Sequence, residues 1–272
     1  MIREWERIPE QCIVTRFPMH LDIELTNNCN LNCEMCPFHG PNKVDSRKGQ
    51  MMDFKLYKKI IDEGSEKGLV SVKLNYGGEP LLYSRLIEAI RYAKEKKLEV
   101  QLNTNGTLLN ALMCLELLYS RLDLLILTDY DIESQHSNLT TLNLLRDAND
   151  KHLRIRVKTN HPEKWLGTCD EIVENKYHDY CNLHEVFKPS KYKCTQPWQR
   201  FLVLVNGTVY NCSCGLVMDD KIIGNAWKQS LEDLWHYKPM KFLRYAHENG
   251  ESHLIRQCRM CPARNEFIKR VK

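Results

Sequence analysis

Long apolar runs, signal sequences and low-complexity segments are all missing from this chain of 272 residues. No apolar run approaches the roughly 18 residues that a membrane-spanning helix needs, and the first residues show neither a signal-peptide core nor a transit-peptide pattern. Glycine and proline are scarce, at 12 and 10 residues, while 43% of the residues are hydrophobic, which excludes disordered and collagen-like chains. We therefore expect a folded protein that resides in the cytoplasm and contacts no membrane.

A strong excess of charge of one sign is missing too. The 39 basic residues nearly balance the 35 acidic residues, so the formal net charge is only +4, and no block of like charge occurs. Proteins that bind nucleic acid or membrane surfaces usually carry such a block or a large positive excess. We therefore expect no nucleic-acid partner.

Cysteine, in contrast, is abundant, with 12 residues. Structural disulfides need an oxidising compartment, so cysteine enrichment in a cytoplasmic chain indicates metal binding or redox chemistry. Most of the cysteines fall into close groups, and these are the candidate metal ligands. The grouped cysteines are Cys29, Cys33, Cys36, Cys194, Cys212, Cys214, Cys258 and Cys261.

Strand and helix signals alternate along the first two thirds of the chain. Strands are predicted at residues 20–26, 71–76, 99–105, 122–128, 152–159 and 182–188. Helices are predicted at residues 54–66, 84–97, 107–119, 138–149 and 163–176. Such alternation indicates an α/β fold with a parallel sheet, and about six units fall short of the eight of a closed barrel. A partial (β/α)6 barrel is favoured, although periodicity alone does not separate it from a doubly wound sheet.

The pattern changes in the last third of the chain. Residues 201–211 read as a β-hairpin with Asn206 and Gly207 at its turn, and residues 230–248 read as a helix interrupted by Pro239. We therefore expect a second, small domain built from a β-hairpin plus helix. The expected domains are the partial barrel, residues 1–188, and the small domain, residues 189–272.

Three of the cysteines, Cys29, Cys33 and Cys36, directly follow the first predicted strand. This position is the carboxyl end of a barrel strand, where such folds place their active sites. Three thiolates on one short loop can hold three irons of a [4Fe–4S] cluster and leave the fourth iron without a protein ligand. A zinc site is the alternative, with His39 as the fourth ligand.

A glycine-rich turn, Gly77-Gly78-Glu79-Pro80, follows the second predicted strand. Glycines allow a ligand to approach the backbone closely, and a carboxylate among them can accept hydrogen bonds from an ammonium group. Taken alone, this GGEP turn could equally be an ordinary strand-to-helix turn with a surface glutamate.

Together, the CxxxCxxC loop and the GGEP turn resemble the radical S-adenosylmethionine (SAM) enzymes, over about residues 19–187. The resemblance implies that the amino and carboxylate groups of SAM bind the open iron, and that reduction cleaves SAM to a 5′-deoxyadenosyl radical. It also implies that the GGEP turn contacts the SAM amino group and that Met35 lies beside the adenine. An electron donor such as flavodoxin or ferredoxin is expected to serve the enzyme.

Polar side chains recur at every second position of the predicted strands. They are Asp22, Glu24, Thr26, Lys73, Asn75, Gln101, Asn103, Asn105, Arg154, Arg156 and Lys158. Because the apolar set opposite must pack on the helices, the polar set should line the barrel lumen as a site for a hydrophilic molecule, unless some of these strands are edges facing solvent. Arg156 or Lys158 is expected to bind the SAM carboxylate. Asn105 is a candidate ribose ligand or, like Thr107, a helix cap.

Four further cysteines, Cys194, Cys212, Cys258 and Cys261, suit a zinc ribbon or a second [4Fe–4S] cluster equally well. The sequences CxxPW, GxxxxC, GN, SLEDLW and CxxC around them resemble the SPASM and twitch extensions of radical SAM enzymes, which carry auxiliary iron–sulfur clusters. No cysteine follows Cys261, and this departure from the full SPASM pattern implies the shorter twitch form, with one auxiliary cluster bound by these four residues.

The favoured function is that of a radical SAM dehydrogenase, because the chain resembles the aminocyclitol dehydrogenase of butirosin biosynthesis. Such an enzyme would abstract hydrogen from a carbinol carbon of a small polar substrate, such as a sugar, cyclitol or nucleoside, and pass an electron to the auxiliary cluster. A radical epimerase, with Cys214 as hydrogen donor, and a peptide-modifying maturase are alternatives. Because the segment before residue 19 is short, we expect no leader-peptide recognition domain and favour a small molecule over a peptide as the substrate. A zinc-binding module without catalytic activity is the third hypothesis.

Overall fold

The computed structural model describes residues 12–41, 43, 47, 49–149, 152–174, 194–212 and 222–259. In this part of the chain the strands form one sheet, in the order β6-β5-β4-β3-β2-β1-β7-β8-β9. Neighbours from β6 through β1 to β7 are parallel, whereas β7, β8 and β9 pair antiparallel. The strands are β1 His20–Ile23, β2 Ser71–Lys73, β3 Glu99–Thr104, β4 Leu124–Thr128, β5 Arg154–Thr159, β6 Glu171–Glu174, β7 Arg200–Val203, β8 Thr208–Tyr210 and β9 Gly224–Asn225.

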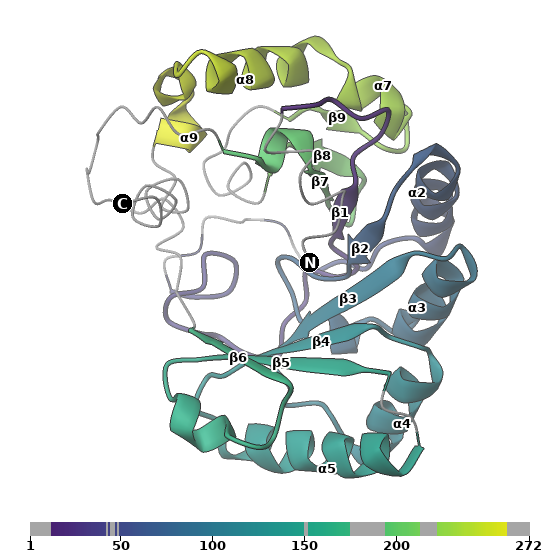
Figure 1. Ribbon diagram of the computed structural model, residues 1–272, viewed down its shortest axis with the longest axis vertical. Helices are drawn as coiled ribbons and strands as arrows, with labels where there is room; N and C mark the ends of the chain where they lie inside the picture. Colours follow the sequence, from purple (N-terminus) through teal and green to yellow (C-terminus); the bar gives the residue numbers. More distant parts are fainter. Residues whose placement is uncertain are drawn as a thin grey trace.

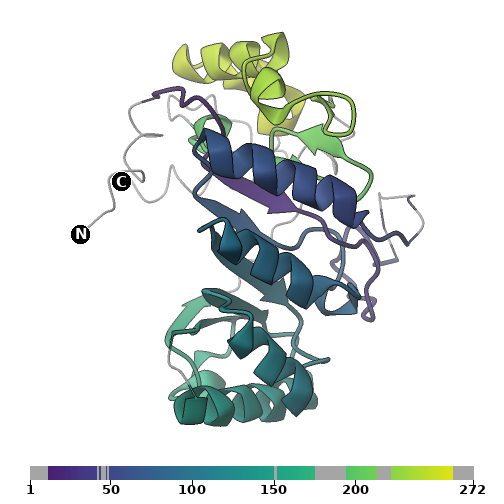
Figure 2. The same ribbon diagram turned by 90° about the vertical axis from the view of Figure 1, so that its right-hand side faces the viewer.

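Helices cover one face of the parallel part of the sheet. The sheet curves from β1 to β6, and α2, α3, α4 and α5 follow its outer side (Figure 1, Figure 2). These helices are α2 Phe54–Lys67, α3 Leu86–Glu95, α4 Ala111–Tyr119 and α5 Glu133–Asn149. Consecutive parallel strands with their helices outside make a partial barrel, so the predicted α/β fold class is confirmed.

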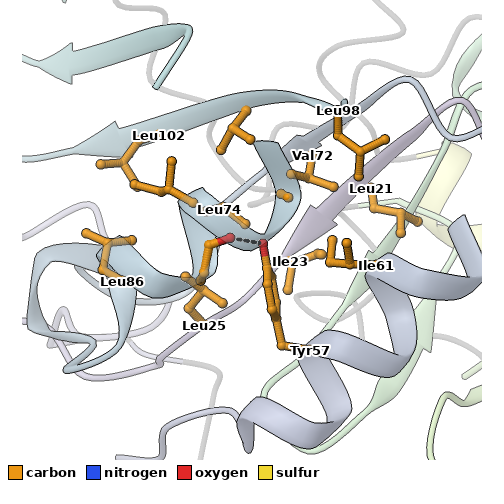
Figure 3. Packing of buried hydrophobic residues seen from close by; sticks show 14 of the residues in the cluster. Leu21, Ile23, Leu25, Tyr57, Ile61, Val72, Leu74, Leu86, Leu98 and Leu102 are labelled. Carbon is orange, nitrogen blue, oxygen red and sulfur yellow. Dashed lines mark hydrogen bonds between the residues drawn. The ribbon is translucent and has the colours of Figure 1, made fainter. Parts of the chain in front are cut away.

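The main hydrophobic core lies between the sheet and these helices. Figure 3 shows part of it, with Leu21, Ile23, Leu25, Val72, Leu74, Leu98 and Leu102 near Tyr57, Ile61 and Leu86. The buried Tyr57 hydroxyl donates a hydrogen bond of 2.8 Å to the carbonyl oxygen of Ala89, which joins α2 to α3. Because side chains alternate along a strand, packing the apolar set here turns the polar set to the opposite face. We call that opposite face the lumen face.

Local sequence signals set the ends of these helices. The Asp53 carboxylate accepts a hydrogen bond from the Lys55 N–H at 2.7 Å and caps the start of α2. Gly68, with φ of 102°, ends α2 in the left-handed conformation that glycine adopts without strain. Asn110, rather than Asn105 or Thr107, caps α4, because its Oδ1 accepts from the Met113 N–H at 2.9 Å. The predicted capping role of Asn105 or Thr107 is therefore wrong.

The helix predicted at residues 163–176 is also wrong. A short 3-10 turn, η2 Pro162–Trp165, is followed by β6, which pairs with β5. Gly167 has φ of 76°, a conformation that interrupts a helix, and the β-branched Ile172 and Val173 favour the strand. The sixth strand of the described sheet thus comes earlier than expected, and the predicted strand at residues 182–188 lies outside the described residues.

The C-terminal hairpin extends the barrel sheet rather than forming a separate one. β7 lies parallel to β1, with Asp22 opposite Leu202. The turn from β7 to β8 contains Asn206 and Gly207, as predicted, and Gly207 has φ of 83°. The predicted interrupted helix is confirmed as α7 Leu231–Trp235 and α8 Lys238–Glu248, and it covers this hairpin (Figure 1). No helix in the described part of the chain is long and apolar enough to span a membrane.

Candidate active site

The loop of residues 29–40, called the cysteine loop below, follows β1 and folds into tight turns. The Cys36 N–H donates to the Cys33 carbonyl oxygen at 3.0 Å, and the Gly40 N–H donates to the Cys36 carbonyl oxygen at 2.9 Å. A Cβ atom on Gly40 would lie only 2.6 Å from that Cys36 oxygen, so the turn requires glycine there. Three cysteines are thereby held on one compact loop at the carboxyl end of β1.

The chemistry of these thiols suits an iron–sulfur cluster. Burial raises the pKa of Cys29 to about 11, and the neighbouring Glu79, Cys36 and Cys33 act in the same direction. Burial also raises the pKa of Cys33, assisted by Cys36. The Cys29 and Cys33 thiols are therefore neutral at neutral pH, and binding of iron would release their protons.

His39 is held by the GGEP turn. Its Nε2 lies 2.7 Å from the Gly77 carbonyl oxygen, and since a carbonyl only accepts, Nε2 donates and only Nδ1 could bind a metal. The described residues also contain no trio of His, Cys, Asp or Glu side chains gathered around one point. A [4Fe–4S] cluster does not require such a trio, because each thiolate binds a different iron. The three cysteines thus fit the predicted cluster better than they fit zinc.

The GGEP turn is held against the cysteine loop by its backbone. The Glu79 N–H donates to the Asn28 carbonyl oxygen at 2.7 Å. A Cβ atom on Gly78 would lie 2.4 Å from the same oxygen, and one on Gly77 would lie 2.5 Å from Glu24 Oε1. Both glycines are therefore required for this close approach.

The Glu79 carboxylate is only 2% exposed and is occupied by groups of its own chain. Its Oε1 accepts from the Leu81 N–H at 3.1 Å and the Thr104 hydroxyl at 2.6 Å, while Oε2 accepts from the Asn105 N–H at 2.8 Å. Burial raises its pKa, and these three hydrogen bonds oppose that effect. Glu79 therefore ties the turn to the end of β3, and the backbone is the part of the turn left for a ligand.

Asn105 joins the end of β3 to the cysteine loop. Its Nδ2 donates to Asn30 Oδ1 at 2.9 Å, and its Oδ1 accepts from the Thr107 hydroxyl at 2.7 Å and N–H at 3.0 Å. Asn30 completes the link, because its Nδ2 donates to the Thr107 hydroxyl at 2.8 Å. The role of Asn105 as a ribose ligand remains a prediction.

A buried ion pair between Glu24 and Arg47 was not predicted from the sequence. Glu24 is fully buried, and its carboxylate accepts two hydrogen bonds from Arg47, at 2.6 and 2.9 Å. It also accepts from the N–H groups of Gly77 and Val205, each at 3.2 Å. The sequence pattern predicts Glu24 as a lumen position. It does not predict these hydrogen bonds, because the partners lie 23, 53 and 181 residues away along the chain.

The two cations predicted to bind the SAM carboxylate differ in their surroundings. Arg156 is paired with Glu171 on β6, at 2.7 Å. The Lys158 side chain forms no hydrogen bond or ion pair with any residue in the described part of the chain. Burial lowers the pKa of its amine to about 8. Lys73 and Arg156 lower that pKa further, whereas Asp22 opposes the change. Lys158 is therefore the more available of the two.

The lumen face is mixed rather than wholly polar. Leu124 and Ile126 alternate with the core residues of β4, and both are buried outside the main core. A second small apolar cluster lies on β7 and β8 and consists of Leu202, Leu204 and Tyr210, with Tyr76 packed against it. Polar side chains therefore face part of the lumen, on β1, β2, β3 and β5.

In the C-terminal part, a buried histidine joins two of the predicted cluster ligands. The Cys194 N–H donates to His247 Nδ1 at 3.4 Å, so the hydrogen of the neutral ring lies on Nε2. That Nε2 is 3.3 Å from Cys258 Sγ, and His247 is only 2% exposed. Cys212 follows β8, and Cys261 and Cys214 lie outside the described residues. Soft sulfur donors beside a fixed N–H donor fit an iron–sulfur cluster.

The sequence matches the family model of the Radical SAM superfamily over residues 23–195. A second model, SPASM, described as an iron-sulfur cluster-binding domain, matches residues 194–262. Because the first match covers more than half of the chain, the chain belongs to the radical SAM superfamily. It is a radical SAM enzyme whose domains imply SAM, a [4Fe–4S] cluster that binds it and auxiliary iron–sulfur clusters, as predicted. This membership replaces the hypothesis of a zinc-binding module.

Two solved structures have a similar fold. BtrN in complex with AdoMet and 2-DOIA superposes with a TM-score of 0.72 and 19% identity, covering 92% of this chain and 94% of that chain. Streptococcus suis SuiB bound to precursor peptide SuiA has a TM-score of 0.64 and 15% identity, covering 88% of this chain and 69% of that chain. At these identities the likeness concerns the fold alone.

Curated relatives match over part of their length. The tungsten-containing aldehyde ferredoxin oxidoreductase cofactor-modifying protein of Pyrococcus furiosus is 33% identical over 125 residues, which are 45% of this chain and 33% of that protein. The PqqA peptide cyclase of Granulibacter bethesdensis is 30% identical over 137 residues, which are 50% of this chain and 35% of that protein. The matches thus span about a third of these relatives.

Proposed function

We propose that this radical SAM enzyme is a dehydrogenase for a small polar alcohol, such as a sugar, a cyclitol or a nucleoside. The observation that carries the proposal is the junction of the cysteine loop and the GGEP turn, made by the 2.7 Å hydrogen bond from the Glu79 N–H to the carbonyl oxygen of Asn28, the residue just before that loop. This junction lies at the carboxyl ends of β1 and β2, beside the polar part of the lumen face. A hydrophilic substrate in the lumen would thus lie next to the radical-generating site.

The proposed clusters divide the chain into two functional parts, the barrel of residues 1–188 and the cluster domain of residues 189–272. When bound, SAM and its cluster supply a 5′-deoxyadenosyl radical, and the auxiliary cluster supplies an electron acceptor. An electron donor such as flavodoxin or ferredoxin would reduce the first cluster. The proposed ligands are Cys29, Cys33 and Cys36 for the first cluster and Cys194, Cys212, Cys258 and Cys261 for the second.

The residues around the cysteine loop would orient SAM. The backbone of the GGEP turn would contact its amino group, and Met35, which is 47% exposed on the cysteine loop, would lie beside the adenine. Lys158 would pair with the carboxylate, because Arg156 is already held by Glu171. Asn105 would contact the ribose from the end of β3.

Oxidation of a carbinol carbon balances in three steps. In the loaded enzyme the carbinol carbon would give up one hydrogen atom to the radical that SAM supplies, the hydroxyl group would release its proton to water, and the remaining electron would pass to the oxidised auxiliary cluster, which would leave a ketone. SAM is consumed as 5′-deoxyadenosine and methionine. Neither oxygen nor a nicotinamide would be needed as the oxidant, and the lumen face would hold the alcohol in place beside the cysteine loop.

The test is an anaerobic assay of reconstituted enzyme with SAM, a reductant and candidate sugars, cyclitols and nucleosides. Release of 5′-deoxyadenosine together with an equal amount of ketone is expected from one of these classes. Replacing all three cysteines of the cysteine loop by Ala should remove about half of the iron, on the stoichiometry of two cubane clusters, and all SAM cleavage. Cleavage that survives this change would show that the radical-generating site lies elsewhere.

Peptide modification is a second candidate, favoured by two of the comparisons. SuiB bound to a precursor peptide shares the fold, and a peptide cyclase is among the relatives. A peptide that stimulates 5′-deoxyadenosine release and gains or loses mass without forming a ketone would support it over the dehydrogenase.

A further inference from the structure

The floor of the lumen, defined by Asp22, Lys73 and Arg200, carries an excess of positive charge. Asp22 on β1 lies opposite Lys73 on β2. Arg200 on β7 lies opposite His20, which is two residues before Asp22 on β1 and faces the same side of the sheet. All three side chains belong to the lumen face, because Leu21, Val72 and Phe201 alternate with them in the core. Strands β1, β2 and β7 therefore bring two cations and one carboxylate together.

The single carboxylate does not neutralise both cations. Arg200 Nη1 reaches Asp22 through long contacts of 3.2 and 3.4 Å, and its Nε is buried without a hydrogen-bond partner among the described residues. The Lys73 side chain forms no hydrogen bond or ion pair with any residue that the structure describes. Burial lowers the pKa of Lys73, Asp22 raises it, and Arg200 lowers it again. The lumen floor thus holds a net charge of about +1 when both cations are protonated.

Closer to the carboxyl ends of the strands, the lumen face carries two hydrogen-bond acceptors without donors among the described residues. The Oδ1 atoms of Asn75 and Asn103 are buried and accept no hydrogen bond in the described part of the chain. They occupy the next lumen positions after Lys73 on β2 and after Gln101 on β3. A buried amide oxygen without a donor is destabilising, and hydroxyl groups of a ligand are suitable donors.

We propose that the substrate is an anionic polyol, whose acidic group binds the lumen floor through Lys73 and Arg200 and whose hydroxyl groups donate to Asn75 and Asn103. Lys73 and Arg200 are partly buried, and a partly buried cation without a counter-charge loses hydration that an anion paired with it would offset. The order along the strands places the anion deepest and the hydroxyl-bearing carbons toward the cysteine loop. This proposal rests on the proposed function only in identifying the bound polyol as the substrate.

The experiment measures binding without turnover. Reconstituted enzyme with SAM is titrated anaerobically by calorimetry with glucose 6-phosphate, gluconate and glucose at constant ionic strength. We expect at least one of the two anions to bind about tenfold more tightly than glucose, since charge-assisted hydrogen bonds are roughly twice as strong as neutral ones. Whichever anion binds better identifies the acidic group as a phosphate or a carboxylate.

Substitutions in the lumen floor test whether its cations cause the preference for the two anions over glucose. Lys73→Met should abolish the difference between the anions and glucose, whereas Lys73→Arg should keep most of it. Arg200→Gln removes the other cation and should also reduce the preference, which provides a second test if Lys73→Met does not fold. Lys55→Met, at an exposed position on α2, is the matched control and should bind like the unchanged chain.

Two results would overturn the proposal. One is equal binding of all three probes, including failure of all three to bind. The other is an anion preference that Lys73→Met leaves intact. Ketone formation is measured separately, so an enzyme that binds anions through Lys73 but makes no ketone would refute the dehydrogenase and leave the anion site standing.

Discussion

Lys158 should make SAM binding depend on pH. Its pKa in the ligand-free chain is about 8, because burial and the nearby Lys73 and Arg156 disfavour the ammonium form while Asp22 only partly opposes them. A SAM carboxylate beside the amine would raise this pKa, since an opposite charge favours the charged form. Affinity that depends on this pair is therefore fully present below about pH 8 and is lost as the pH rises through the pKa of the complex.

The expected size of the effect follows from that pKa. One pH unit above the pKa of the free amine, about nine tenths of it is neutral, so binding at about pH 9 should be roughly tenfold weaker than at about pH 7. Lys158→Arg keeps its charge throughout this range and should remove the dependence. Lys158→Met should bind SAM weakly at every pH, with a loss of about tenfold or more.

The assay is anaerobic calorimetric titration of SAM into reconstituted enzyme across this pH range. The amino group of SAM also titrates near about pH 8, so the informative quantity is the ratio of the Kd values of the unchanged chain and Lys158→Arg. Arg156→Gln is a control, because removing that like charge should move the inflection to higher pH. A ratio that stays constant with pH, or normal affinity in Lys158→Met, would show that the carboxylate is bound elsewhere.

Three further predictions concern single side chains. Glu79→Gln presents an amide NH2 to at least one of the donors that the carboxylate now satisfies, so thermal unfolding should show that the free energy of unfolding falls by about 1–3 kcal/mol. The control Glu88→Gln, on the exposed face of α3, should change this free energy little. His247→Leu removes the N–H donor to Cys258 and should lower the reduction potential of the auxiliary cluster. In an EPR-monitored redox titration the ratio of reduced to oxidised cluster should change by about tenfold at a given potential. An unchanged reduction potential would exclude this hydrogen bond in the loaded enzyme. Cys214→Ala should retain ketone formation, and solvent deuterium incorporated at carbon in an unoxidised product, abolished by this change, would instead establish an epimerase.

The cysteine loop and the GGEP turn could be predicted from the sequence because their chemistry depends on residue type at short spacing. Metal ligands on one loop must be cysteines a few residues apart, and a backbone that passes within 2.4 Å of a would-be Cβ must be glycine. The alternation of polar and apolar residues likewise predicted the lumen face of β1, β2 and β3, because a strand has only two faces.

Contacts between distant segments could not be predicted in this way. His247 lies 53 residues from Cys194, and nothing in the sequence around either residue indicates that the imidazole reaches its backbone. The strand β6 was mistaken for a helix because four residues are too few to show a period of two. Its pairing with β5, reinforced by the ion pair of Arg156 and Glu171, decides its conformation instead.

Glu24 connects both halves of the candidate site through one fully buried carboxylate. It accepts hydrogen bonds from the Gly77 N–H, in the turn expected to contact SAM, and from the Val205 N–H, just beyond β7. The strand β7 leads through the hairpin to Cys212, an expected ligand of the auxiliary cluster. Since the Arg47 guanidinium also pairs with this carboxylate, any shift of the GGEP turn relative to β7 would leave a buried charge or N–H group unpaired. Glu24 therefore fixes the GGEP turn relative to β7, and in the proposed dehydrogenase it would thereby set the separation of the two proposed cluster sites.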